Sequence, residues 1–274
     1  MENQTATLED VALAQGSRWL EVSRYRDGHY GMEQDQVAEE CPVALVFNGI
    51  SHAVMMATPL ELELLAIGFA LSEGIVARRE DIYALEVLPA CEGFTVQLEI
   101  AQSAFMALKS RRRALAGRTG CGICGIESLA MLDLKPERIA QSAQPFALAP
   151  QAIATASAGL RQAQQLMAHT GGVHAAAWCA LDGSILRVHE DVGRHNALDK
   201  LLGFLADSKV EVRSGFVFMS SRASYELVRK AARLQLPLLA TISAPTTLAV
   251  QMAELSGISL LSFCRSNGFV RYGN

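Results

Sequence analysis

Two cysteines three positions apart, Cys121 and Cys124, are the residues of this chain best suited to do chemistry. They lie in the glycine-rich segment GRTGCGICG, residues 117–125. A thiolate is the reactive form of cysteine, and nearby cations lower the pKa of a thiol. Glycines let the backbone turn sharply and leave the sulfur atoms open to a large partner. The preceding stretch supplies cations and no acid: Lys109, Arg111, Arg112, Arg113 and Arg118. This arrangement indicates sulfur chemistry.

Four other interpretations of the cysteine pair fit the sequence poorly. A structural zinc site needs four ligands, and the chain has no second C-x-x-C. A thioredoxin-like pair opens a helix early in a βαβ unit, whereas this pair follows a basic segment. A zinc deaminase has H-x-E upstream of P-C-x-x-C, whereas His189 and Glu190 are adjacent and lie downstream, and Gly120 stands before Cys121. The fourth interpretation is that both cysteines are surface thiols without a function, but exposed paired thiols are prone to oxidation. We therefore expect no zinc.

Four polar segments stand where a predicted strand meets a helix or a loop. Ligands of α/β proteins bind at the carboxyl ends of strands, helix N-termini offer N–H groups to anions, and an arginine fork suits phosphate. Each segment alone has a structural alternative: residues 187–196 could equally be a polar turn with a helix cap, the glycine pair is usually only a helix stop, and residues 220–224 could be a cluster of helix N-caps. Together they predict one pocket for a large phosphorylated ligand. The candidate residues are Gly171, Gly172, His174, Asp191, Arg194, His195, Asn196, Ser221, Arg222, Phe263, Cys264, Arg265, Ser266, Asn267 and Gly268.

Hydrophobic periodicity predicts an α+β chain with an α/β C-terminal part. We expect a flexible tail over 1–17, a mainly β domain over 18–105, a basic helix with the C-x-x-C loop over 106–145, and an α/β domain over 146–274. Asn48-Gly49 between apolar runs is a strong hairpin signal, and alternating strands and helices favour a sheet covered by helices. The predicted strands are 19–26, 43–47, 50–56, 82–88, 94–100, 173–181, 185–188, 216–219, 238–242 and 258–263. The predicted helices are 60–71, 101–115, 150–168, 196–205, 224–234 and 247–255.

Composition narrows the function classes. The 274 residues are 50% hydrophobic, which is enough for a substantial core in one or two domains. A net charge of −4 argues against nucleic-acid binding. Neither a signal peptide nor an apolar run long enough to cross a membrane is visible, so we expect a cytoplasmic protein without membrane contact. Cys41, Cys91 and Cys179 are expected to be buried as small hydrophobic residues.

Several quoted segments together resemble the FdhD family of formate dehydrogenase accessory sulfurtransferases. They are CGICG at 121–125, TGGVHAA at 170–176, EDVGRHNALDK at 190–200 and SRASYELV at 221–228. Ser221 is a departure, because many relatives carry glycine there. The resemblance implies a C-terminal domain with a three-layer, cytidine-deaminase-like fold that lacks zinc. It also implies a homodimer.

The resemblance further implies a mechanism. Cys121 would accept a persulfide from a cysteine desulfurase, with Cys124 helping its release. The sulfur would pass to the molybdenum cofactor in its bis(molybdopterin guanine dinucleotide) form, before insertion into the catalytic subunit of formate dehydrogenase. GDP would mimic the guanine arms, and Cys264 would line the pocket without carrying sulfur. The alternative is a cofactor-binding chaperone whose cysteines only hold or shield the metal.

Overall fold

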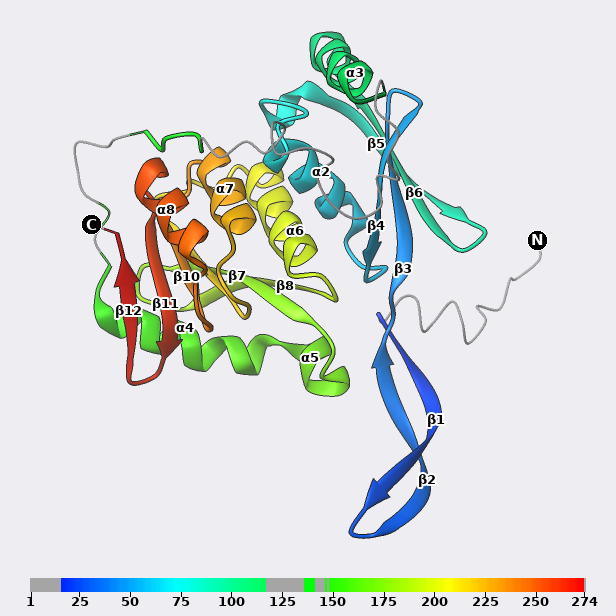
Figure 1. Cartoon of the computed structure of the whole chain (residues 1–274), viewed down its shortest axis with the longest axis vertical. Helices are drawn as coiled ribbons and strands as arrows, with labels where there is room; N and C mark the ends of the chain where they lie inside the picture. Colours follow the sequence, from blue (N-terminus) through cyan, green and yellow to red (C-terminus); the bar gives the residue numbers. More distant parts are fainter. Residues whose placement is uncertain (1–15, 117–135, 141–145, 147, 274) are drawn as a thin grey trace.

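A computed structural model describes residues 16–116, 136–140, 146 and 148–273. It has a small sheet with two helices, a larger sheet covered by helices on both faces, and a projecting two-stranded ribbon (Figure 1). This mixed α/β architecture confirms the fold class predicted from the sequence; the specific likeness to a deaminase domain stays a prediction. Within the described ranges, no helix is long and apolar enough to span a membrane.

The ribbon consists of β1 (Ser17–Arg26) and β2 (His29–Ala38), paired antiparallel along their whole length. Asp27 and Gly28 close it in left-handed conformations, with φ of 50° and 88°, as a two-residue Asp-Gly hairpin turn requires. Strand β1 was predicted from the sequence, whereas β2 was not. Strand β1 already begins at Ser17, the last residue of the expected tail.

The small sheet has the strand order β4-β3-β6-β5. Its strands are β3 (Cys41–Phe47), β4 (Ile50–Ala57), β5 (Ile82–Ala90) and β6 (Gly93–Ile100), with a short 3-10 turn at Arg79–Asp81. In β3 the alternate residues Val43, Leu45 and Phe47 are buried, as expected for a strand with one face on a core. That face packs against α2 (Leu62–Ser72) and α3 (Gln102–Ala116). Helix α3 runs across the domain boundary expected at residue 105.

The large sheet has the order β12-β11-β10-β9-β7-β8. Its strands are β7 (His174–Ala180), β8 (Ile185–Asp191), β9 (Gly215–Met219), β10 (Leu238–Thr241), β11 (Ser259–Arg265) and β12 (Gly268–Tyr272). Strands β9, β10 and β11 are parallel, and β7 is antiparallel to both of its neighbours. Helices α4 (Pro150–Ala163) and α5 (Gln165–Thr170) lie on one side of this sheet, with α4 packed against its face.

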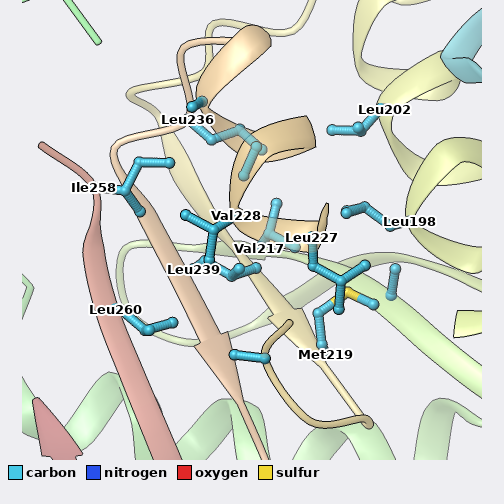
Figure 2. Packing of buried hydrophobic residues seen from close by; sticks show 14 of the residues in the cluster. Leu198, Leu202, Val217, Met219, Leu227, Val228, Leu236, Leu239, Ile258 and Leu260 are labelled. Atoms are coloured by element: carbon cyan, nitrogen blue, oxygen red, sulfur yellow. The ribbon is translucent and has the colours of Figure 1, made fainter. Parts of the chain in front are cut away.

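The other face of the large sheet carries α6 (Arg194–Asp207), α7 (Tyr225–Arg233) and α8 (Thr247–Ser256). Figure 2 shows how leucine and valine side chains of α6 and α7 fill the space above the central strands. Leu198, Leu227, Val217 and Leu239 in this cluster are completely buried. Burying side chains of this size contributes roughly 1.5–3 kcal/mol each, so this layer holds the strand ends in place.

Two expectations in this half were wrong. The single helix expected over 150–168 is divided at Gln164, because the Glu190 carboxylate accepts the backbone N–H groups of Leu166 and Met167 at 2.8 and 2.9 Å and so starts a new helix. The last strand was expected to end at residue 263, whereas β11 extends to Arg265 and is followed by a further strand, β12, which pairs with it antiparallel.

The two halves meet where α2 crosses α6. A Cβ atom on Gly68 would lie 1.7 Å from the Asp199 carbonyl oxygen, and one on Gly203 would lie 2.0 Å from that of Leu64. Only glycine permits such close approach of the two backbones.

A buried ion-pair cluster reinforces this crossing. Lys230 Nζ lies 2.8 Å from both Asp199 Oδ2 and Glu73 Oε1 and donates to Ser72 Oγ at 2.8 Å. Burial alone would raise the pKa of Glu73, but the charges of Lys230 and Arg229 lower it to about 2. The cluster therefore joins α2 to α6 and α7 across the interface between the halves.

Candidate functional site

The predicted site segments meet along one edge of the large sheet. The carboxyl ends of β8, β9, β10 and β11 lie at this edge, together with the start of β7. Ser220 exchanges hydrogen bonds with Ala175 of β7, its N–H donating at 3.0 Å and its Oγ accepting at 2.8 Å. Ser243 N–H donates to the Ser221 carbonyl, and Phe263 N–H donates to the Ser243 carbonyl. Four segments far apart in sequence thus form one continuous surface.

Asp191 lies at the end of β8 and is completely buried. Its Oδ2 accepts from Thr58 N at 3.1 Å and Thr58 Oγ1 at 2.9 Å, and lies 2.6 Å from Lys200 Nζ. Its Oδ1 accepts from Gly193 N at 2.9 Å and Asn196 Nδ2 at 2.8 Å. Asn196 also donates to the Met56 carbonyl. Both side chains are therefore engaged inside the protein, where they fix the start of α6. Their expected direct contact with a ligand stays a prediction.

A histidine–carboxylate contact joins the N-termini of α6 and α7. His195 Nε2 lies 2.8 Å from Glu226 Oε2, and this interaction is the main cause that lowers the pKa of Glu226. His174, at the start of β7, lies close by. Burial, and then the charges of Arg194 and His195, lower the pKa of His174. The lowered pKa favours the neutral form of the His174 imidazole, which lies near the positive charge of Arg194. This combination suits an anionic ligand.

Arg222 and Phe263 are exposed candidates along this edge. Arg222 has no ion pair or side-chain hydrogen bond with any residue that the structure describes. Phe263 is 44% exposed and has a φ of 55°, at an irregularity in the pairing of β11 with β12. A bulky residue rarely adopts this left-handed conformation, and such strain clusters at functional sites. A guanidinium and an aromatic ring are thus available for a phosphate and a flat ring.

The remaining candidates on β11 have different roles. Cys264 is completely buried, and burial raises its pKa to about 11, so its thiol is poorly suited to carry sulfur. Arg265 Nη1 donates to the carbonyls of Ile242 and Cys264. Ser266 and Asn267 form the exposed turn to Gly268.

Gly171 and Gly172 lie between α5 and β7. Gly171 ends α5 in a left-handed conformation with φ of 67°. A Cβ on Gly172 would lie 3.7 Å from the Ala38 Cβ at the base of the ribbon. The pair therefore acts as a helix stop, and its approach to a ligand stays a prediction.

The two reactive cysteines, Cys121 and Cys124, lie outside the described residues. The basic helix α3 that precedes them is present, and it lies at the far end of the small sheet from the site edge (Figure 1). Cys41 and Cys179 are buried as expected. The expectation for Cys91 was wrong: it is exposed in the turn between β5 and β6.

Sequence reasoning missed the side chains that support the site. Glu61 has a left-handed φ of 53°, and its Oε2 lies 2.6 Å from Nδ1 of the buried His189. Its Oε1 accepts from Arg187 at 3.1 Å. Lys200 is completely buried beside Asp191, and Glu226 contacts His195. Most of these contacts join positions that are far apart in the sequence, so no local pattern indicated them.

No group of three or more His, Cys, Asp or Glu residues is placed to hold a metal ion in the part of the chain that the structure describes. The site edge instead presents a guanidinium, imidazoles and an aromatic ring.

Comparisons with known proteins agree on one family. A model of the FdhD/NarQ family matches residues 38–274. "Sulfur carrier protein FdhD" of Chromobacterium violaceum is 64% identical over 258 residues, covering 94% of this chain and 96% of that protein. The protein of the same name from Burkholderia cenocepacia is 57% identical, covering 94% of each chain.

A solved structure supports the fold. The crystal structure described as a formate dehydrogenase accessory protein from Desulfotalea psychrophila superimposes with a TM-score of 0.72, covering 94% of this chain and 97% of that one at 23% identity. The family match over most of the length and the two close relatives lead to one conclusion: this chain belongs to the FdhD/NarQ family.

Proposed function

We propose that this protein is a sulfur carrier that accepts persulfide sulfur on Cys121 from a cysteine desulfurase. It delivers that sulfur to the molybdenum cofactor, in the bis(molybdopterin guanine dinucleotide) form, for the catalytic subunit of formate dehydrogenase. The observation that carries the proposal is that close relatives matched over nearly the whole chain bear the name of a sulfur carrier. The C-x-x-C pair gives this name a chemical basis.

The proposed transfer needs one reactive thiolate at each step. The Cys121 thiolate attacks the outer sulfur of the desulfurase persulfide, the S–S bond breaks, and the desulfurase cysteine leaves as a thiolate. Cys124 then attacks the outer sulfur, so that this sulfur moves to Cys124 and Cys121 leaves as a thiolate, or it attacks the mixed adduct and so speeds release. The cofactor is the substrate of the second step. The unpaired Arg222 and the exposed Phe263 at the sheet edge support binding of its phosphates and guanine there.

Mass spectrometry tests this proposal directly. After incubation with a desulfurase and cysteine, a peptide containing Cys121 should gain the mass of one sulfur atom, and this gain should disappear on reduction. Cys91 is the internal control, because it is exposed but isolated. A protein that never acquires the adduct, yet still supports formate dehydrogenase, would be a cofactor-binding chaperone instead.

The basic run should accelerate persulfide loading through its charge. Replacing Arg111, Arg112 and Arg113 by Gln is expected to slow loading most at low ionic strength, because salt screens attraction between charged surfaces. Stopped-flow loading rates across a salt series measure this. Replacing the exposed Arg26, Lys209 and Arg271 by Gln is the control, because it removes the same number of positive charges. If the triple variant and the wild type load persulfide at equal rates at every salt concentration, the basic run has no role in loading and is only a solvated helix surface.

Guanine nucleotides should bind at the sheet edge in preference to adenine nucleotides. Arg222→Ala should weaken GDP binding by more than tenfold, about 1.4 kcal/mol, because an arginine fork can contact two phosphate oxygens at once. Calorimetry with GDP and ADP measures both effects. The control is Arg138→Ala, which lies beside α8. Equal affinity for the two nucleotides, or no effect of Arg222→Ala, would place the cofactor elsewhere.

The ribbon supports the expected homodimer. Its register places Trp19, Tyr25, Tyr30 and Met32 on one face, where each is more than 60% exposed. Glu21 is the only charge on that face, whereas Arg24 pairs with acids on the opposite one. A twofold interface must be complementary to itself, and an almost uncharged aromatic face meets that condition. A two-stranded ribbon is only marginally stable on its own, which also favours its packing against a second copy.

A charge on this face should break the dimer. Tyr30→Glu with Met32→Glu is expected to convert a dimer to a monomer, measured as molar mass by light scattering. Arg26→Glu on the opposite face is the control and should remain dimeric. A monomeric wild type, or a double variant that stays dimeric, would contradict the prediction.

A further inference from the structure

A groove follows one edge of the large sheet, beside its outermost strand β8. The groove has a volume of about 630 Å³, which is within the range of pockets that bind ligands. It is lined by β8, by residues just before α2 and by the junction of α4 with α5. Its apolar lining consists of Leu60, Ala163, Leu166, Ile185, Leu186 and Val188.

Strand β8 directs backbone groups to its outer edge. In an antiparallel ladder both backbone groups of a residue point to one side, and consecutive residues alternate. Ala175 of β7, opposite Glu190, directs both of its groups to Ser220 and so away from β8. Glu190 therefore faces the outer edge, where its carbonyl accepts from Thr58 Oγ1. Val188, two residues earlier, faces the same edge, and an edge of this kind accepts a further strand.

The charged groups that line the groove are already paired. Glu61 contacts Nδ1 of His189 and accepts from Arg187. Glu190 accepts from two backbone N–H groups at the start of α5. Leu186, by contrast, is 60% exposed, and an exposed apolar strand edge is a site of aggregation unless it is covered. The groove therefore suits an extended segment that is apolar and uncharged.

The chain itself reaches the groove at Gly16. This residue is buried and has a φ of 69°, and a Cβ atom on it would lie 2.6 Å from Leu60 Cδ1 and 3.6 Å from Leu166 Cδ2. Both leucines line the groove. Because consecutive Cα atoms are about 3.8 Å apart, Gln15 must lie next to the same end of the groove.

The residues before Gly16 match the groove in chemistry and in length. They lie outside the described residues, and positions 11–15 read VALAQ, which carries no charge. Five extended residues span roughly 17 Å, as do five residues of β8. Gly16 adjoins Leu166, whose N–H donates to Glu190. Residue 15 therefore starts at the Glu190 end of β8, and an extended segment would place Val11 towards Leu186.

We propose that residues 11–15 dock in this groove as an additional strand beside β8 and run in the same direction as β8. Their backbone pairs with the outward-facing groups of Val188, and the side chains of Val11 and Leu13 cover the apolar lining. The occupant is thus a segment of the same chain, which protects the edge of the sheet. The inference does not depend on the sulfur-transfer function.

Hydrogen exchange of the full chain, followed by mass spectrometry, tests the proposal. The backbone amides of residues 11–15 should exchange at least tenfold more slowly than in the denatured chain. Val11→Asp with Leu13→Asp should remove this protection, and the Val188 amide should then exchange at least tenfold faster, because the two segments protect each other. Thr5→Asp with Thr7→Asp is the matched control, since it adds the same charge outside the docking segment and should leave both protections intact.

A substitution in the groove tests the same contact from the other side. Leu186→Asp should also remove the protection of residues 11–15, and circular dichroism checks that the fold is retained. Leu255→Asp, at a leucine of α8 that is 54% exposed, is the control and should leave the protection intact.

Three results would overturn the proposal. The first is a wild type in which residues 11–15 exchange as fast as in the denatured chain, and the second is protection that survives Leu186→Asp in a folded variant. The third is protection of Val188 that increases with protein concentration and is unaffected by Val11→Asp with Leu13→Asp, because a second copy of the chain would then occupy the groove.

Discussion

Cys121→Ala is expected to abolish activation of formate dehydrogenase in cells while the amount of soluble protein stays unchanged. A persulfide forms only on a reactive thiolate, and the five cations that precede this position in the sequence favour the thiolate. Alanine removes the attacking sulfur and leaves the glycine-rich segment otherwise intact. No other cysteine is suited to replace it: Cys41, Cys179 and Cys264 are buried, and burial raises their pKa values.

Formate-dependent dye reduction in a strain that lacks its own copy of the carrier measures this effect, with immunoblots for the protein level. Cys91→Ala is the matched control, because it removes the one isolated cysteine that is exposed in the described residues. Cys124→Ala should reduce activation less than Cys121→Ala, since the second thiol only assists release. Full activation by Cys121→Ala would contradict sulfur transfer and favour the chaperone.

The central strands were predictable because their sequences carry the signal of burial on both faces. Phe216 to Met219 and Leu238 to Thr241 are short apolar runs between polar segments, as parallel central strands should be. Strand β2 lacks this signal. It contains four consecutive polar residues, Glu33 to Gln36, most of its side chains are exposed, and the strand exists through its pairing with β1. The Asp27-Gly28 turn was the local clue that could have indicated it.

The break between α4 and α5 had no local signal. Gln164 is neither glycine nor proline, and the helix is divided by the carboxylate of Glu190, 23 to 24 residues further along the chain. A capping group that is distant in sequence cannot be recognised from helix propensity alone.

The position of the site could be predicted from the sequence, but the contacts inside it could not. Strand-end geometry predicts that segments after β8, β9 and β10 meet at one edge, and hydrogen bonds from Ser220 to Ala175 and from Ser243 to Ser221 join them there. The partner of Asp191, by contrast, is Thr58, 133 residues away. Pairing of that kind depends on how the two halves pack.

The buried pair of Asp191 and Lys200 connects those halves beneath the site. Both side chains are 0% exposed, and Lys200 Nζ donates to Thr58 Oγ1 at 2.6 Å as well as contacting the carboxylate. Each charge is stable in this position only because the other is present, since an unpaired ion in a protein interior is strongly destabilising. The same carboxylate holds Gly193 and Asn196, so the pair also determines where α6 begins.

Asp191→Ala is therefore expected to destabilise the protein by about 3–5 kcal/mol, because it leaves the Lys200 ammonium buried without a counter-charge. Guanidinium denaturation followed by circular dichroism measures the free energy of unfolding. Combining Asp191→Asn with Lys200→Met should recover much of the loss, since it removes both charges and keeps similar volumes. Arg18→Ala, which breaks a surface pair with Glu39, is the control and should cost less than about 1 kcal/mol. A loss below that value for Asp191→Ala, or a double variant no more stable than the single one, would mean that the pair does not hold the two halves together.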